Sequence, residues 1–249
     1  MEPLVLHTAL DAPRDLIWDY VSTAGGLACW QADAVSGSLT DGQFSLCWPQ
    51  LGARMDLSVA EVSRGERLVL RAGETALELT LGDRELLLEH HGLHEEDDWI
   101  GLESSWRAAL SVLELAITRH PRVERKVTWM FQPVLASAEL IHHYFTDRQG
   151  LGLWLGATKE SLSAQRPFEL DINYQIITGQ VLCAERDVCL SIDQWKNGAL
   201  NLRTLPAPND GRVAAIGVST WNYGLTPVLL NHLESSLSRL VRSAYCAQS

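Results

Sequence analysis

The sequence predicts an α+β protein that contains the same kind of domain twice, each with an antiparallel sheet and a long closing helix. Three observations support this fold class: an internal repeat, a series of strand-like segments in each half, and a long amphipathic segment at the end of each half. The chain has 249 residues, enough for two small domains with their own cores. We expect these domains at residues 1–120 and 124–249, with the short charged segment 118–126 between them.

An internal repeat relates residues 13–30 to residues 137–154 without a gap. The segment PRDLIWDYVSTAGGLACW aligns with SAELIHHYFTDRQGLGLW. Identical residues occupy aligned positions at Leu16 and Leu140, Ile17 and Ile141, Gly26 and Gly150, Leu27 and Leu151, and Trp30 and Trp154. Because the copies lie half a chain apart, the repeat indicates duplicated domains rather than a solenoid of short units. Each copy predicts a pair of short helices, with Pro13 in the first helical turn.

Each repeat is followed by segments with the composition of β-strands, separated by turn signals. In the first half these segments are residues 43–48, 54–62, 67–72, 75–81 and 84–91, after an opening strand at 4–10. In the second half they are residues 166–172, 174–184, 187–192, 199–205 and 212–221, after an opening strand at 125–131. The sequences RGE, GD, NG (197–198) and PAPNDG (206–211) are typical of tight turns between strands.

Each half ends in a long segment with helical periodicity. In the first half, apolar residues recur every three or four positions at Trp99, Leu102, Trp106, Ala109, Leu110, Leu113 and Ile117. Glu103 and Arg107 lie four residues apart on the expected outer face, where they can form an ion pair. In the second half the apolar stripe consists of Leu225, Leu229, Leu233, Leu237 and Leu240. Thr226 and Pro227 are typical of a helix N-cap and first turn.

This order of elements resembles the helix-grip, or START-like, superfamily. Within it, the chain is most similar to the bacterial relatives of the ATPase activator of the ninety-kilodalton heat-shock chaperone. The resemblance is carried by APRDLIWDYVSTAGGLACW (12–30), RLVLRA (67–72), HHGL (90–93) and GLESSWRAALSVLELAI (101–117), with weaker copies at 140–156 and 229–241. It implies two tandem helix-grip domains, each with a curved sheet around its long helix and an apolar ligand between the two. Because the motifs are structural, the resemblance implies a fold more strongly than an activity.

The charge balance excludes some classes of partner. The formal net charge is −11, whereas binding to nucleic acid or to an anionic membrane needs clustered Lys and Arg. No apolar run approaches the roughly 18 residues of a membrane span, and the N-terminal sequence lacks the features of a signal peptide. We therefore expect a cytoplasmic protein with no nucleic-acid partner and no membrane partner.

The sequence lacks the motifs of common catalytic chemistry. Its five cysteines are scattered and form no CxxC pair, so neither a disulfide framework nor a zinc knuckle is indicated. It contains no GxSxG nucleophile elbow and no glycine-rich phosphate loop. We expect no cofactor, no catalytic residue, and no activity that depends on a cysteine or a metal, although distant residues can converge in a fold.

The stretch EHHGLHEEDD (89–98) is the strongest candidate for a metal site, since it holds three histidines and five carboxylates. However, His90 and His91 are adjacent and point to opposite faces of a strand, so they do not bind one ion together. The acidic residues Glu96, Asp97 and Asp98 suit the N-terminus of the helix that follows. We interpret the stretch as the end of a strand and a loop, with no metal site.

Three functions are compatible with the predicted fold. The favoured function is a binding protein for a small apolar or aromatic molecule. One alternative is an enzyme of the cyclase or aromatase type, which needs polar side chains in the cavity, and the candidates are Arg54, Asp56, Glu169 and Tyr174. The other alternative is a co-chaperone-like interaction protein, which the family resemblance implies without any surface that the sequence identifies.

The two long helices differ in side-chain size, and this predicts where a ligand binds. The second helix presents a ridge of leucines that should fill its own domain, so we expect that domain to be mainly structural. The first helix mixes large residues with small ones, which leave space beside an aromatic wall. We predict a cavity in the first domain, with the lining residues Trp48, Leu57, Trp106, Ala109 and Leu110.

The duplication also predicts the state of assembly. Because one chain already holds two copies, we expect an intramolecular pseudo-dimer that is a monomer in solution. A homodimer is the alternative, since two-fold pairing is the commonest oligomeric state.

Overall fold

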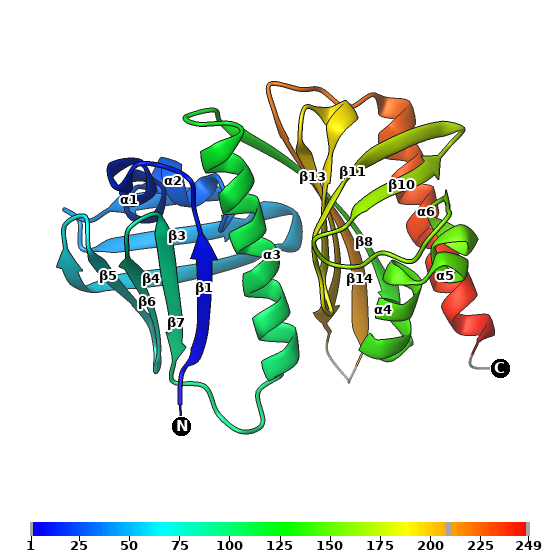
Figure 1. The fold of residues 1–249 in the computed structure, drawn as a ribbon. Helices are drawn as coiled ribbons and strands as arrows, with labels where there is room; N and C mark the ends of the chain where they lie inside the picture. Colours follow the sequence, from blue (N-terminus) through cyan, green and yellow to red (C-terminus); the bar gives the residue numbers. More distant parts are fainter. Residues whose placement is uncertain (1, 208–210, 248–249) are drawn as a thin grey trace. The chain divides into compact units, whose positions relative to one another are not determined.

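The computed structural model describes residues 2–207 and 211–247 (Figure 1). Within these residues the chain forms two seven-stranded sheets, and their paired strands are antiparallel. In each half of the chain, a long helix follows the last strand of the sheet. The prediction of an α+β protein with two tandem helix-grip domains is therefore confirmed.

The first sheet has the strand order β1-β7-β6-β5-β4-β3-β2. Its strands are β1 (Leu4–Ala9), β2 (Ala34–Ser38), β3 (Gln43–Trp48), β4 (Ala53–Ser63), β5 (Arg67–Ala72), β6 (Thr75–Leu81) and β7 (Glu85–His91). The helices of this half are α1 (Arg14–Ser22), α2 (Ala24–Ala28), the short 3₁₀ helix η1 (Pro49–Leu51) and the long α3 (Trp99–Thr118).

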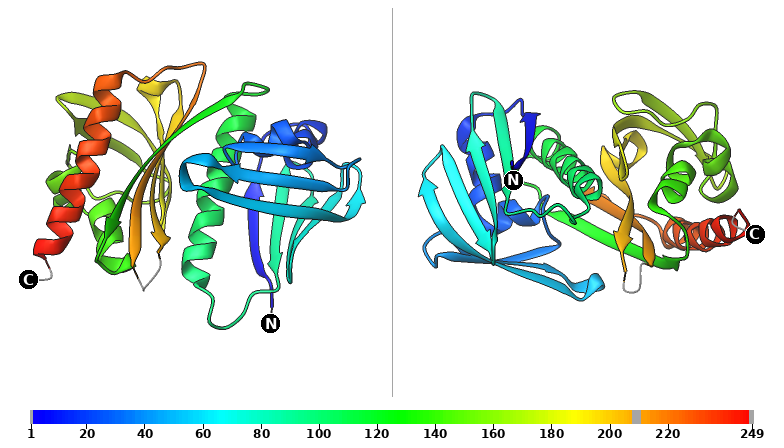
Figure 2. Two further views of the ribbon diagram at one scale, coloured as in Figure 1. Left: turned by 180° about the vertical axis from the view of Figure 1, so that it is seen from behind. Right: turned by 90° about the horizontal axis from the view of Figure 1, so that it is seen from below.

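The second sheet repeats this order as β8-β14-β13-β12-β11-β10-β9. Its strands are β8 (Arg125–Val134), β9 (Ala157–Thr158), β10 (Pro167–Ile172), β11 (Gln175–Ala184), β12 (Val188–Ile192), β13 (Gly198–Pro206) and β14 (Arg212–Trp221). The helices are α4 (Ala138–Thr146), α5 (Arg148–Trp154), the 3₁₀ helix η2 (Asp193–Trp195) and the long α6 (Pro227–Cys246), which runs along one face of the sheet in Figure 2.

The chain divides into two compact units. The first unit comprises Met1–Trp99 and Val112–Arg125, and the second comprises Ile100–Ser111 and Lys126–Ser249. Helix α3 therefore contributes its C-terminal part to the first unit and most of its N-terminal part to the second.

The register of the first sheet separates an apolar face from a polar one. Leu79 in β6 pairs with Leu68 in β5 and with Leu88 in β7, and all three side chains are fully buried. One residue earlier in β6, Glu78 pairs with Glu89 in β7. Because side chains alternate between faces of a strand, these carboxylates lie on the face opposite the leucines.

The core of the second unit contains the leucine ridge of α6. Leu233, Leu237 and Leu240 have no exposed surface and belong to the same apolar cluster as the sheet residues Leu200 and Val218. The helix begins after Thr226, whose side chain accepts a hydrogen bond from the backbone N–H of Leu229 at 3.3 Å. The expected N-cap is observed, and three leucines of the predicted ridge lie in the core, whereas Leu225 and Leu229 are only partly buried.

The short helix pairs explain why the internal repeat keeps its glycines. In each copy the second helix passes close to the backbone of the first. A Cβ atom on Gly26 would lie 2.2 Å from the carbonyl oxygen of Asp19, and one on Gly150 would lie 2.9 Å from that of His143. Because both distances are shorter than normal van der Waals contact, each position requires the absence of a side chain.

The repeated tryptophans fix the same helix pairs by hydrogen bonds. The indole Nε1–H of Trp30 donates to the carbonyl oxygen of Tyr20 at 3.1 Å. The indole of Trp154 donates to the carbonyl oxygen of Tyr144 at 2.7 Å, and these residues occupy the aligned positions of the second copy. Both indoles are almost completely buried, so each bond satisfies a donor that water cannot reach.

Two edge strands, β2 and β9, lie outside the predicted strands. The sequence AVSGS of β2 is small and polar, and β9 has only two residues. Neither strand shows the alternating apolar pattern on which the other predictions depend. The turn predicted in PAPNDG falls partly on residues 208–210, which are outside the described residues.

Among the described residues, no helix combines the length and the apolarity that a membrane crossing requires.

Candidate functional site

The five residues predicted to line a cavity lie in both compact units. Trp48 at the end of β3 is half-buried, and Leu57 in β4 is buried; both belong to the first unit. Trp106 and Leu110 are buried and Ala109 is half-buried, and all three lie in the part of α3 that belongs to the second unit. The structure therefore groups the three helix residues but does not place the five in one unit. A cavity at these residues stays a prediction.

A pocket of about 490 Å³ opens in the second unit, and we call it the grip pocket. It is bordered by the β10–β11 hairpin, by η2 and by the start of α6. Its lining residues are Ile172, Gln175, Ile176, Ile177, Gln194, Trp195, Tyr223, Thr226 and Leu229. Volumes of about 300–1,000 Å³ are typical of pockets for small molecules.

Local structure explains how the hairpin and α6 form this pocket. Asn173 and Tyr174 both have positive φ, 54° and 62°, and they make the tight turn that pairs Ile172 with Gln175. On the helix side, Leu229 continues the leucine ridge toward the N-terminus but is only partly buried. The ridge therefore fills the core from Leu233 onward and leaves space at Leu229.

Side-chain hydrogen bonds hold η2 against β11. The carboxamide of Gln194 accepts a hydrogen bond from the backbone N–H of Thr178 at 3.0 Å and donates one to the Thr178 hydroxyl at 3.2 Å. The same hydroxyl donates to a carboxylate oxygen of Asp193 at 2.9 Å. These bonds fix the segment that carries the buried Trp195 at the wall of the pocket.

The chemistry of the grip pocket is that of a binding site for a neutral molecule. Its nine lining residues include no carboxylate, no lysine or arginine, no histidine and no cysteine. Isoleucine, leucine, tryptophan and tyrosine supply the walls, while two amides and two hydroxyls can orient a polar group of the ligand. The pocket therefore offers apolar contact with a few hydrogen bonds and no general acid or base near neutral pH.

A second pocket, of about 440 Å³, lies in the first unit beside α1, α2 and residues 122–125. Two of its charged groups, Arg125 and Asp33, are engaged within the protein. Arg125, whose side chain is 6% exposed, donates to the carbonyl oxygen of Ala32 at 2.6 Å and lies 4.0 Å from Asp33. Burial lowers the pKa of Arg125 to about 10, and the neighbouring Asp33 and Cys29 oppose that shift. The residues around this pocket thus anchor the segment that follows α3.

A buried ionic cluster occupies the second unit where α3 meets the start of β12 and the strand β13. Asp187, 2% exposed, accepts from Arg203 Nε at 2.9 Å, from the Ser105 hydroxyl at 3.2 Å and from the backbone N–H of Thr204 at 3.2 Å. Arg203 also donates to Ser105 at 2.6 Å. The backbone N–H of Asp187 donates to Ser104 at 2.6 Å. Because the charges and hydroxyls satisfy one another, this cluster is a structural anchor for α3.

Three of the five cysteines, Cys29, Cys183 and Cys189, are buried as packed side chains, whereas Cys47 is half-buried and Cys246 is exposed. Cys183 and Cys189 are buried, and burial raises the pKa of the Cys183 thiol to about 12. Burial also raises the pKa of Cys29. A thiol with a raised pKa is a poor nucleophile near neutral pH, since the thiolate is the reactive form.

The polar residues considered for a cyclase-type site lie at the surface. Arg54 and Asp56 form an ion pair at 2.9 Å in which both side chains are about two-thirds exposed. Tyr174 is 97% exposed at the tip of its hairpin, and Glu169 is paired with Lys159 at 2.9 Å. Arg54, Asp56 and Tyr174 therefore face solvent, whereas Glu169 is half-buried and borders another pocket of about 400 Å³ in the second unit.

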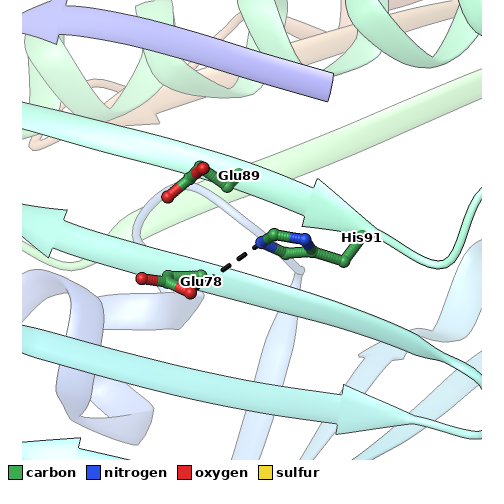
Figure 3. A group of neighbouring side chains, drawn as sticks. All are labelled: Glu78, Glu89 and His91. Atoms are coloured by element: carbon green, nitrogen blue, oxygen red, sulfur yellow. Dashed lines mark ion pairs between the residues drawn. The ribbon is translucent and has the colours of Figure 1, made fainter. Parts of the chain in front are cut away.

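The histidine-rich stretch has the predicted local structure. Strand β7 ends at His91, a loop follows, and α3 begins at Trp99. In that loop, Asp97 accepts a hydrogen bond from the backbone N–H of His94 at 2.7 Å. His91 nevertheless has two acidic neighbours that the sequence did not predict. The metal-binding atoms of Glu78, Glu89 and His91 all lie within 4.8 Å of one another, and Figure 3 shows these side chains together on one face of β6 and β7.

No family model and no curated protein matches the sequence. Among solved structures, the chain is similar to StfQ, the di-domain ARO/CYC of the steffimycin biosynthetic pathway, with 13% identity and a TM-score of 0.45, covering 98% of this chain and 99% of that chain. It is similar to DynU16, from the dynemicin biosynthetic locus, with 18% identity and a TM-score of 0.43, covering 98% and 99%. The Aha1 dimer from Colwellia psychrerythraea matches with 17% identity and a TM-score of 0.43, covering 48% of this chain and 98% of that chain. The assignment of two helix-grip domains rests on this chain's own strand order and closing helices.

Proposed function

We propose that this chain of two tandem helix-grip domains is a binding protein for a small apolar or aromatic molecule, held in the grip pocket. The supporting observation is the lining of that pocket, in which apolar and aromatic walls surround a few uncharged polar groups. Ligand sites in proteins have this composition. The sequence predicts a ligand site in the first domain, whereas the grip pocket lies in the second unit.

The lining also specifies the class of ligand. Trp195 and Tyr223 present aromatic groups, and Ile172, Ile177 and Leu229 present branched aliphatic ones. A charged ligand would lose its hydration without gaining an ion pair from any of the nine residues. We therefore expect a neutral molecule with a flat or branched apolar body and one or two hydrogen-bonding groups that reach Gln175, Gln194 or Thr226.

Filling the grip pocket should abolish binding. In Leu229→Trp, the larger side chain occupies the space at the start of α6, and we expect the affinity for the neutral fluorescent dye Nile red to fall at least about tenfold. The melting temperature should change little, because residue 229 is only partly buried and the new ring enters existing space. Fluorescence titration of both proteins, with thermal melts, measures the two effects.

The variant Ala109→Phe tests the cavity that the sequence predicts beside the first long helix. If the ligand binds in the grip pocket, this variant keeps its affinity for Nile red. Where no space exists at residue 109, overpacking costs about 1–3 kcal/mol of stability. Loss of dye binding in Ala109→Phe, together with normal binding in Leu229→Trp, would show that the ligand site lies at the helix residues predicted from the sequence and that our assignment is wrong.

The state of assembly belongs to the same proposal. One chain with two helix-grip domains needs no partner copy to form a pair, so we expect light scattering at micromolar concentration to give the mass of one chain, 27.6 kDa. A stable particle of twice that mass would contradict the pseudo-dimer and favour two-fold pairing of chains. A cytoplasmic location stays a prediction.

A further inference from the structure

We propose that Glu78, Glu89 and His91 form a binding site for a divalent transition-metal ion, with Zn²⁺ as the preferred ion. The three side chains come from the neighbouring strands β6 and β7 of the first unit (Figure 3). Their candidate ligand atoms, two carboxylate oxygens and one imidazole nitrogen, lie within 4.8 Å of one another. This site is separate from the grip pocket and does not depend on the proposed function.

The sheet register creates the arrangement. Glu89 and His91 are two residues apart in β7, so their side chains point to the same face. Glu78 is the direct cross-strand partner of Glu89. The neighbouring His90 points to the opposite face, so the conclusion that two adjacent histidines do not share an ion still holds. The third ligand comes from another strand, eleven residues earlier in the chain.

The distances suit a metal ion better than a direct contact. His91 Nε2 lies 3.8 Å from Glu78 Oε2, which is beyond hydrogen-bonding range. That nitrogen is buried and has no hydrogen-bond partner among the described residues. Two ligand atoms on one tetrahedral zinc ion are about 3.4 Å apart, given zinc–ligand bonds of about 2.0–2.2 Å. Small side-chain rotations therefore bring the three atoms to bonding distance.

The charge around the site also favours a cation. Glu78 and Glu89 are directly opposite each other, a pairing of like charges that destabilises a sheet. Arg67 donates to both oxygens of Glu78, at 2.5 and 2.9 Å, and also pairs with Glu61. Three carboxylates and one guanidinium leave a formal charge of −2, which one divalent ion neutralises.

Arg67 keeps Glu78 available as a ligand. The two hydrogen bonds from Arg67 stabilise the Glu78 carboxylate and fix its orientation. Each carboxylate oxygen has two lone pairs, so an oxygen bound to Arg67 can still bind a metal. The fourth ligand of a tetrahedral zinc ion would be water.

The donor set selects the kind of ion. One imidazole nitrogen with two carboxylates suits zinc and its first-row neighbours. Calcium takes six to eight oxygen ligands, and magnesium prefers oxygen ligands and retained waters, so neither fits a histidine with two carboxylates. We therefore expect Zn²⁺ to bind and Mg²⁺ to bind at least about a hundredfold more weakly.

The test is calorimetric titration of untagged, chelator-treated protein with ZnCl₂. Because Cys246 is exposed and could bind zinc itself, the titrations use a Cys246→Ser background. We expect one equivalent of Zn²⁺ to bind, and the affinity to fall at least tenfold in His91→Ala and in Glu89→Gln. The matched control is His94→Ala, which removes an exposed histidine from the same stretch and should leave the affinity unchanged.

Several outcomes would overturn the proposal. One is the absence of zinc binding to the parent protein, and another is an equal loss of zinc affinity in His94→Ala and His91→Ala. The third is equal affinity for Mg²⁺ and Zn²⁺, which would indicate a general attraction of cations to acidic groups. Circular dichroism checks that each variant is folded, and Glu89→Gln tests the site if His91→Ala does not fold. Nile red binding to the same variants separates this result from the proposed function, because a ligand in the grip pocket is unaffected by them.

Discussion

Replacing Asp187 with alanine is expected to lower the free energy of unfolding by about 3–5 kcal/mol. The variant removes a carboxylate that is 2% exposed and leaves the Arg203 guanidinium, 23% exposed, without its ionic partner. It also leaves the Ser105 hydroxyl and the backbone N–H of Thr204 without their acceptor. Because an unpaired buried charge is costly, the loss should exceed that of an ordinary hydrogen bond. Urea denaturation followed by tryptophan fluorescence measures the change.

An exposed ion pair provides the control for this prediction. Asp11 and Arg84 lie 2.8 Å apart, with side chains that are 83% and 70% exposed. Water screens such a pair, so Asp11→Ala should leave the denaturation midpoint unchanged within error. If Asp187→Ala also left the midpoint unchanged, the cluster at the start of β12 would not anchor α3, and the stability of the second unit would have to come from its apolar core alone.

Gly26→Ala is expected to destabilise the first unit by about 1–3 kcal/mol or more. The added Cβ would lie 2.2 Å from the carbonyl oxygen of Asp19 and 2.5 Å from the Cα of Tyr20, both backbone atoms that cannot turn aside. Helices α1 and α2 would have to separate, which would also stretch the hydrogen bond from Trp30 to Tyr20. Thermal unfolding of the variant measures the loss.

The adjacent glycine is the matched control. A Cβ on Gly25 meets nothing within 4 Å, and the residue lies in the same helix, so Gly25→Ala should be neutral or slightly stabilising. The second repeat offers the same comparison, because Gly150 is crowded at 2.9 Å and Gly152 is not. Gly150→Ala should be milder than Gly26→Ala, since the approach is less close. Equal effects at Gly25 and Gly26 would contradict close packing as the reason for the repeated glycine.

The sequence by itself determined the elements of this protein and their duplication. Strands β5, β6 and β14 begin and end where they were predicted, and α6 begins after Thr226. Such elements are predictable because the apolar period and the turn or cap residues lie within one short window of sequence. The repeat was also visible, because close packing in each helix pair requires a glycine and a tryptophan at fixed positions.

Only the tertiary structure decided which of these residues meet. Ile177, Trp195 and Leu229 line one pocket, yet each is an ordinary apolar residue in its own segment. The register that places Glu78 opposite Glu89 is set by the pairing of two strands, so it cannot be predicted from the sequence of either strand alone. The parity of Arg54, Asp56 and Tyr174 was open for the same reason. Contacts of this kind depend on how distant segments pair and pack, and a shift of one residue moves every side chain to the other face.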